Sequence, residues 1–469
     1  MSNLGLDIAA SGIAADTTAL DTAAQNLANI STAGYARETV NDAPVEAAVP
    51  GGSGQGVLVT AVTQTTSSLY DQLNLAATAG LGFANESAIV SQAVQNAVPE
   101  ATSSGFQNTL NQFWSDLSSF ASEPQSAAAA STVIQDAQNV ANGINEMAAQ
   151  FSATAQQLQS DLEGPASSTT SGGLLAQANQ LIKTIAQLNA GIAAGNGGGL
   201  DVNALVDSRR AALTKLAGLL NIRTAIQPTG EVTVWSGGIE LVQQTNATTL
   251  HASGSAANAD LAITTTGGLN VPVGGQIGAL LQGVDVTIPS YQSQLDNLAN
   301  SLASTLNPLQ AAGVSSGGTP GSANPAIFVD QGSTSTFVAG AGSAATIAVA
   351  PALVANPSLI STASPGTIGA SIDAGTVQQM AAVGAQANGP DNVYQQLVAS
   401  VGNDGASANA AQATAQQLSN ATTAELSSVE GVNTNEETVH VLQAQQNFQA
   451  SAQVINAINA SFQSLLQAV

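Results

Sequence analysis

Apolar residues recur every seven positions near both ends of the chain. The amino-terminal series is Leu6, Ile13, Leu20 and Leu27. The carboxyl-terminal series is Val441, Phe448, Ile455 and Phe462, with Ile458 and Leu465 three positions after the last two. A seven-residue period places each series on one face of a helix. We expect the two helices to pair as a coiled coil, which would make the domains discontinuous. The alternative is that each stripe packs on its own globular neighbour.

Further helical periodicity fills the interior of the chain. Residues 133–158 and 174–192 carry long apolar seams, separated by a breaker at Pro165. Leucines recur through 295–306, and Pro289 precedes them at a position where a first helical turn tolerates a missing N–H. The pattern predicts a mainly α, elongated protein, arranged as a helical bundle.

Strand patterns are confined to a few segments. Residues 57–62 follow the glycine-rich turn 51–56 and predict a short hairpin arm. Residues 229–242 alternate around Ser-Gly-Gly, which predicts a hairpin inside a small β module at 222–275. The Gly, Ser, Thr and Pro-rich block 313–375 is compatible with strand, loop or both.

These patterns predict three discontinuous domains. A terminal coiled-coil domain comprises 1–50 plus 425–469. A mainly helical bundle with a hairpin arm comprises 51–221 plus 276–424. The small β module lies between them in sequence, at 222–275.

Composition narrows the classes of function. The chain has 469 residues, of which 44% are hydrophobic but only 3% aromatic, so small side chains must do most of the packing. Thirty acidic residues against six basic ones give a net charge of −24, which disfavours nucleic acids and anionic membrane surfaces. Cysteine is absent, so folding is independent of redox state. We expect no cleaved signal peptide in the first ten residues and no membrane-spanning helix.

The sequence offers little catalytic chemistry. His251 and His440 lack cysteines or acids at ligand spacing. Acidic residues are scattered singly apart from Glu436 and Glu437, and Thr434 with Glu437 predicts a capping box at the start of the last helix. We therefore predict no catalytic residue, no cofactor and no bound metal.

Residues 26–37 read NLANISTAGYAR and follow the first heptad stripe directly. This segment resembles the signature of the rod, hook and hook-associated proteins of the bacterial flagellum, in which an Asn-rich helix end leads into Thr-x-Gly-Tyr, here beginning at Thr32. We expect Asn29 and Gly34 to adopt positive φ and end the helix, and Tyr35 to act as an anchor. GVNTNEE at 431–437 resembles the matching carboxyl-terminal signature.

The middle of the chain narrows the resemblance. Residues 205–224, 274–281 and 291–313 are similar to the family of the first hook-associated protein, at the hook-filament junction. Arg210 stands where that family usually has an acid, Gln310 where it often has His, and Asn74 where an Arg is common. These departures suggest that hydrogen bonding has replaced charge pairing.

The resemblance implies a structural subunit that joins the hook to the filament and catalyses nothing. It also implies export as unfolded chain, a cytoplasmic export chaperone on the last helix, and a helical ring of copies between hook protein and the second junction protein. The chain would be secreted to the flagellum after a transient cytoplasmic stage. The expected assembly residues are the two stripes plus Asn29, Thr32, Gly34 and Tyr35. A hook or rod subunit, or a secreted coiled-coil binding protein, are the alternatives.

Overall fold

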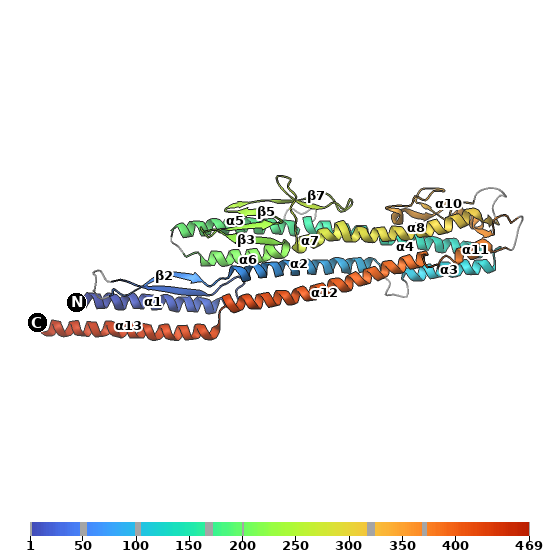
Figure 1. Ribbon diagram of the computed structural model, residues 1–469. Coiled ribbons are helices and arrows are strands. Elements are labelled where there is room, and N and C mark those ends of the chain that lie inside the picture. The colour runs from blue at the N-terminus through green and yellow to red at the C-terminus, as the bar shows by residue number, and fades with distance from the viewer. Residues whose placement is uncertain are drawn as a thin grey trace.

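The chain forms an elongated molecule with both termini at one end (Figure 1). The computed structural model describes residues 2–46, 54–98, 105–164, 172–198, 201–316, 324–367 and 373–468. Helices run along the long axis, and small sheets lie on one side of them. The expected mainly α fold with a small β module is confirmed. The breaker at Pro165 lies outside the described residues.

The terminal arm consists of the first and last helices and one hairpin. Its elements are α1 (Ser2–Ala28), α13 (Thr434–Ala468), β1 (Glu38–Pro44) and β2 (Val57–Gln64). The helices α1 and α13 lie side by side, so the predicted pairing of the two termini is confirmed (Figure 1). The strands β1 and β2 are antiparallel and both contact α1.

Two long helices connect the arm to the far end of the molecule. They are α2 (Ser68–Ala97) and α12 (Pro390–Glu430), which contact each other extensively. At the far end they join a bundle made of α3 (Phe106–Ser122), α4 (Ala127–Glu163), α8 (Ile288–Ala312) and α11 (Gly375–Ala381). Long helices therefore set the distance between the arm and the bundle.

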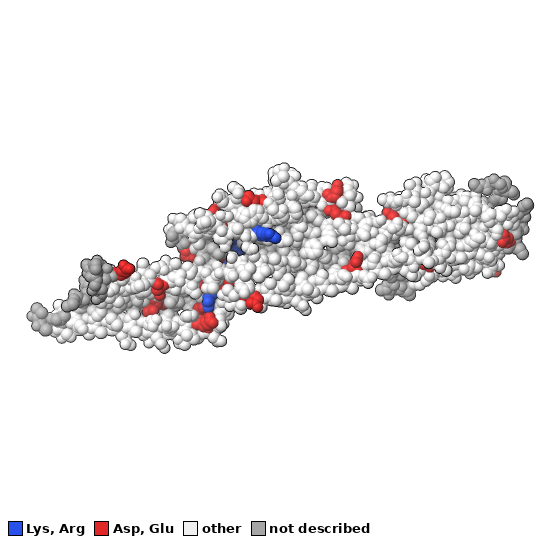
Figure 2. All heavy atoms as spheres, viewed as in Figure 1, with Lys and Arg blue, Asp and Glu red and all other residues white. Residues whose placement is uncertain are grey.

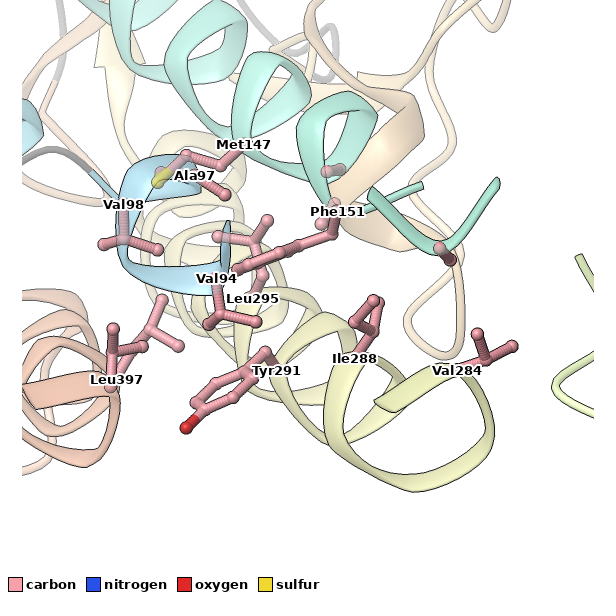
Figure 3. Close-up of a cluster of buried hydrophobic side chains, with 14 of the residues drawn as sticks. Val94, Ala97, Val98, Met147, Phe151, Val284, Ile288, Tyr291, Leu295 and Leu397 are labelled. Atoms are coloured by element: carbon pink, nitrogen blue, oxygen red, sulfur yellow. The ribbon is translucent and has the colours of Figure 1, made fainter. Parts of the chain in front are cut away.

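The bundle core gathers side chains from four helices. Figure 3 shows Val94 of α2, Phe151 of α4, Leu295 of α8 and Leu397 of α12 converging on one cluster. Phe151 and Leu295 are fully buried. The hydroxyl of Tyr291 points toward α12, where it donates to Asp404. The seam predicted for 133–158 is thus the buried face of α4.

Helix α8 (Ile288–Ala312) begins one residue before Pro289, as expected, but it continues a run that is already helical. The segments α7 (Gly275–Gln282), η1 (Gly283–Thr287) and α8 form one continuous helical run. The segment η1 is a π-helical turn that ends two residues before Pro289. A wider turn there accommodates a residue that lacks an N–H and whose ring would clash with a preceding carbonyl. The position predicted for Pro289, in the first turn of α8, is therefore confirmed, and what the pattern did not predict is the helical run that precedes it.

The β module contacts the first of two helices that pack on each other, and its strand β3 contacts α2. The helices are α5 (Leu174–Gly198) and α6 (Asn203–Leu219); the strands are β3 (Ile222–Ile226), β4 (Val232–Ser236), β5 (Ile239–Gln243), β6 (Asn246–Ala247), β7 (Leu250–Ser253) and β8 (Ala262–Thr265). Strands β3 to β6 form one antiparallel sheet in sequence order, and β7 pairs with β8. The hairpin predicted around Ser-Gly-Gly is β4–β5.

The block 313–375 contains both strand and loop. Its elements are β9 (Val314–Ser315), β10 (Phe328–Asp330), α9 (Ser343–Thr346), β11 (Ile347–Val349), α10 (Pro351–Ala355), η2 (Pro357–Leu359) and β12 (Ser361–Ala363). Strand β10 pairs with β11, and β12 pairs with β9. These short pieces cover one side of the bundle, where they contact α4 and α8 (Figure 1).

Two expected domain limits fall inside structural units. The limit after residue 50 separates β1 from β2, which pair with each other. The limit before residue 425 falls within α12, which continues to Glu430. The three-domain division itself stays a prediction.

Acidic side chains are scattered over the face in Figure 2, with few basic ones among them and a mostly uncharged surface between.

Candidate functional site

The flagellar-type signature forms an elbow where the arm meets the rest of the molecule. We define the elbow as residues 26–38, 64–71, 203–210 and 430–437. Four chain segments that are distant in sequence meet there: the end of α1, the start of α2, the first half of α6 and the break between α12 and α13. Its geometry decides how the arm is held.

Helix α1 ends through a side chain and a glycine. Asn29 donates from Nδ2 to the carbonyl of Gln25 at 3.0 Å, and Thr32 Oγ1 donates to Asn29 Oδ1 at 3.1 Å. Gly34 has φ +84°, and a Cβ there would lie 2.8 Å from the carbonyl oxygen of Asp207. The positive φ predicted for Gly34 is confirmed. The positive φ predicted for Asn29 was wrong, because its amide caps the helix end instead.

Asn26 organises the elbow, and sequence reasoning did not single it out. It is 1% exposed, and its Oδ1 accepts from Tyr35 Oη at 2.7 Å and from the N–H of Glu38 at 2.9 Å. Its Nδ2 donates to the carbonyl of Glu38 at 2.9 Å. The hydroxyl of Tyr35 is therefore held in place by Asn26. Burial is the main cause that raises the pKa of Tyr35, and the nearby charge of Glu38 raises it further. The signal that the sequence offered for this residue is its position next to Leu27 of the apolar stripe, where a polar side chain is directed toward a buried face.

Glu430 ties three segments together at the end of α12. It is 3% exposed, and its backbone carbonyl accepts from the N–H of Arg37 at 2.8 Å. Its Oε1 accepts from the N–H of Ser67 at 2.5 Å, and its Oε2 lies 2.8 Å from Nη1 of Arg210. Burial raises the pKa of Glu430, although the Ser67 hydrogen bond and Arg210 oppose this. The Glu430 carboxylate thus links the end of α12 to the start of α2 and, through a charge-assisted contact, to α6.

Arg210 contradicts the expected replacement of charge pairs by hydrogen bonds. Besides Glu430, it places Nε 3.4 Å from Oδ1 of Asp71. The expectation was wrong here because both acids come from segments far away in sequence. At Gln310 and Asn74 hydrogen bonds do occur: Gln310 Oε1 accepts from a backbone N–H at 2.9 Å, and Asn74 Oδ1 accepts from Thr423 at 3.3 Å.

The hairpin and α13 are fastened to the same elbow. Gln64 Nε2 donates to Asp207 Oδ1 at 2.7 Å, which links β2 to α6. Arg37 Nη1 lies 2.8 Å from Glu436 Oε2, which links the chain after α1 to α13. The partly exposed pair adds little stability by itself. Its geometry nevertheless orients the start of α13.

The predicted capping box at α13 is replaced by an asparagine cap. Thr434 is the first helical residue, so it stands one position too late to be the cap. Asn433 Oδ1 accepts from the N–H of Asn435 at 3.0 Å, and its carbonyl accepts from the N–H of Glu437 at 3.0 Å. Asparagine and threonine both serve as caps, and the sequence pattern alone did not choose between adjacent candidates.

The two heptad stripes meet along the arm through small residues. A Cβ on Gly12 would lie 3.1 Å from Ser451 Oγ, and one on Gly5 would lie 3.3 Å from Ile458 Cδ1. The residues Leu6, Ile13, Leu20, Leu27, Val441, Ile455 and Ile458 are half-buried. Phe448 and Phe462 stay 37% exposed, and the side chain of Leu465 lies outside the described part. The seam is therefore formed but incompletely covered.

The arm also leaves large apolar side chains uncovered. On α1 and its end these are Leu4, Ile8 and Ile30; on α13 they are Val439, Leu442, Val454 and Leu466. Exposure reaches 77% at Leu466 and 60% at Val439. A paired helix that keeps this much apolar surface in water has a face suited to further packing.

In the described ranges, histidine and acidic side chains are not clustered as the ligands of a metal ion would be. These residues include no group of three or more His, Asp or Glu side chains placed to hold a metal ion. Within the same ranges, none of the helices combines the length and apolar character needed to cross a bilayer.

Comparisons with known proteins match the middle of the chain and its carboxyl-terminal end. The family described as the flagellar hook-associated protein FlgK helical domain matches residues 91–324. The family of the flagellar basal body rod FlgEFG protein C-terminal matches residues 427–468, which include α13.

Curated relatives carry one name. Flagellar hook-associated protein 1 of Escherichia coli K12 is 26% identical over 336 residues, covering 68% of this chain and 59% of that protein. The Salmonella typhimurium protein of the same name is 27% identical over 338 residues, with the same coverage. The one from Bacillus subtilis is 26% identical over 239 residues, covering 48% of this chain and 45% of that protein. The chain thus spans 59% or less of the length of these relatives.

A solved structure of the flagellar hook junction protein FlgK from Burkholderia pseudomallei is also similar. It has 26% sequence identity and a TM-score of 0.48, over 55% of this chain and 46% of that one. On the matches to the helical domain, to the carboxyl-terminal helix and to the curated relatives, the chain belongs to the flagellar hook-associated protein 1 family.

Proposed function

We propose that this protein is a structural subunit that joins the flagellar hook to the filament. The observation that carries the proposal is the incompletely covered arm, in which α1 and α13 pair but leave Phe448, Phe462 and Leu466 exposed. An isolated soluble protein gains nothing from such a face, whereas a subunit uses it to pack against its neighbours. Membership of the hook-associated protein 1 family supports the same role.

The assembly residues are the two stripes and the elbow residues Asn29, Thr32, Gly34 and Tyr35. In this proposal the stripes supply the contact surface between subunits. The elbow residues act indirectly, because they set the direction in which the arm leaves α6 and α12. The surroundings of Asn26 and Glu430 add two further positioning residues to this set.

The partners follow from the proposed position in the flagellum. Copies of the chain form a helical ring, with hook protein on one side and the second junction protein on the other. A cytoplasmic export chaperone holds α13 before the unfolded chain passes through the export channel. The lack of cysteine suits that route, because no disulfide has to be broken. The subunit is secreted and has no enzymatic activity.

A hook or rod subunit is the nearest alternative. The resemblance implies mostly β domains in the middle of those proteins. Here α4, α5 and α6 occupy most of 130–220, which favours the junction subunit. A secreted coiled-coil binding protein would account for the arm but not for the matched helical domain.

Electron micrographs of a deletion strain test the proposal. We expect hooks without attached filaments, restored when the full chain is supplied from a plasmid. A plasmid carrying the chain without its last helix is the matched control and should not restore filaments. Normal filaments on the deletion strain would refute the junction role, and loss of the hooks themselves would favour the rod or hook alternative.

A further inference from the structure

A cavity opens at the elbow on the side of α6. It has a volume of about 550 Å³ and is bounded by the loop after α1, by α2, α6 and the end of α12, and by strands β3 and β4. Its lining includes Arg209, Arg210 and Lys215. The whole chain has only six lysines and arginines, so half of its basic residues line one cavity.

Arg209 is buried without an acidic partner. Arg209 is 5% exposed. Its Nη1 donates to Asn189 Oδ1 at 3.0 Å and to the carbonyl of Gly230 at 2.7 Å. Both acceptors are neutral. Arg209 therefore makes two hydrogen bonds through Nη1 and no ion pair within the described residues. A buried cation in this state retains a strong demand for an anion.

The other two cations of the lining, Arg210 and Lys215, differ in whether they have an acidic partner. Arg210 is already flanked by Asp71 and Glu430. Lys215 is exposed at the rim and forms no ion pair with any described residue. The cavity lining also includes Asp71 and Glu430, and both of these carboxylates pair with Arg210. Arg209 and Lys215 form no ion pair within the described residues, so the lining keeps an excess of positive charge. Burial, with repulsion from Arg210, lowers the pKa of Arg209 to about 10, consistent with a guanidinium that lacks a counter-charge.

The terminal arm carries anions of the complementary kind. Asp7, Asp21 and Asp42 are exposed and make no ion pair within the described residues. They share the arm with the uncovered apolar side chains, so a surface that packs against another copy brings carboxylates with it. A chain of net charge −24 also needs cationic contacts wherever copies lie close together.

We propose that this cavity binds a carboxylate from the terminal arm of a neighbouring copy of the same chain. Arg209 receives the carboxylate inside the cavity, and Lys215 guides it at the rim. The inference rests on the proposed function, because it requires copies to lie side by side. It adds a specific binding site for the arm, the cavity lined by Arg209 and Lys215, which we call the socket. Apolar packing alone does not provide such a site.

Cysteine cross-linking in assembled flagella tests the socket, and the chain has no cysteine of its own. Lys215→Cys is combined in turn with Asp7→Cys, Asp21→Cys and Asp42→Cys. We expect a disulfide-linked dimer in isolated hook-filament structures for at least one combination. Lys183→Cys is the matched control, since Lys183 is exposed on α5 and does not line the cavity. No dimer in any combination, or equal dimer with Lys183→Cys, would overturn the proposal.

A charge variant supplies an independent measurement. Lys215→Gln should weaken attachment, so that the fraction of cells keeping filaments after mild shear falls at least about twofold, as expected for loss of one interfacial charge contact. Lys183→Gln should not change it. If Lys215→Gln behaves like Lys183→Gln while acetate and sulfate both raise the thermal midpoint of the free protein, the cavity takes small anions and the neighbour is not its ligand. Detection of the chain at the junction by antibody separates either failure from failure of the proposed function.

Discussion

The bundle and the terminal arm differ in what they bury. In the bundle, Phe113, Phe120 and Phe151 are at most 2% exposed. In the described parts of α1 and α13, the buried apolar residues are alanines, such as Ala15 and Ala444. The larger apolar residues of the arm are half-buried or exposed. The bundle completes its own core, whereas the arm is completed only when another surface covers it.

Removing the carboxyl-terminal stripe should give the largest effect. A chain without residues 440–469 should remain soluble and keep the thermal midpoint of its bundle, but should neither polymerise nor attach to hooks. Each large side chain of the stripe contributes about 1.5–3 kcal/mol when fully buried, which no other part of the arm can replace. Analytical ultracentrifugation and filament counts check this. Normal filament growth on the truncated chain would show that the arm is dispensable.

Matched phenylalanine substitutions should separate the two regions in the isolated protein. Phe151→Ala should lower the free energy of unfolding by about 3–5 kcal/mol, because it leaves a cavity in a closed core. Phe462→Ala should change it by less than about 1 kcal/mol, because its side chain is partly solvated. Urea unfolding followed by circular dichroism measures both. Similar losses would mean that the arm is already a finished core.

A charge placed on the arm stripe should disrupt two associations together. Phe462→Asp would put an unpaired carboxylate into the contact with the export chaperone and into the assembled junction, which costs at least about a hundredfold in affinity. The reason is that both partners would use the same face of α13. Calorimetric titration against the cognate chaperone and filament counts measure the two. Unchanged chaperone affinity with lost assembly would show that the faces are separate.

Limited proteolysis should trim the arm before the bundle. In the free protein, cleavage should remove both ends and leave a resistant fragment of roughly 70 to 420, because a two-helix seam rich in small residues is marginally stable. Mass spectrometry of the fragments over time reads this directly. Equal resistance of the ends and the middle would contradict the contrast between the regions.

The smallest effect concerns an acidic pair inside the bundle. Burial, together with the neighbouring Asp116, raises the pKa of Asp136 to about 6. Because this folded-state pKa lies above the unfolded value, the pair costs stability above pH 6 and the cost fades as the pH falls from 6 to 4. Asp136→Asn should therefore stabilise the protein at pH 7 to 8, by less than about 1 kcal/mol since solvent screens the pair. Thermal midpoints measured from pH 4 to 8 compare the variant with the unsubstituted chain. The same dependence of the midpoint on pH in both proteins would show that the pair does not affect stability.

Periodicity predicted the helices well because it reports a local property. The seams at 133–158 and 174–192 became the buried faces of α4 and α5, since a helix that buries one face must repeat apolar residues at helical spacing. The β4–β5 hairpin was predictable for a similar reason, as its turn residues stand between its own strands. Element boundaries set by one residue, such as the cap at Asn433, were not.

The sequence by itself determined the mainly helical class, the pairing of the two ends and the family, because heptads and signature residues are read within one segment. Only the tertiary structure decided the elbow. Glu430 lies 363 positions from Ser67 and far from Arg210, so no local pattern signals their contact. The same holds for the cavity at Arg209, whose walls come from segments across the whole chain. The role of a charged side chain or a buried asparagine depends on the groups that it contacts. Those groups come from distant parts of the chain, and sequence periodicity reports only on neighbours within one element.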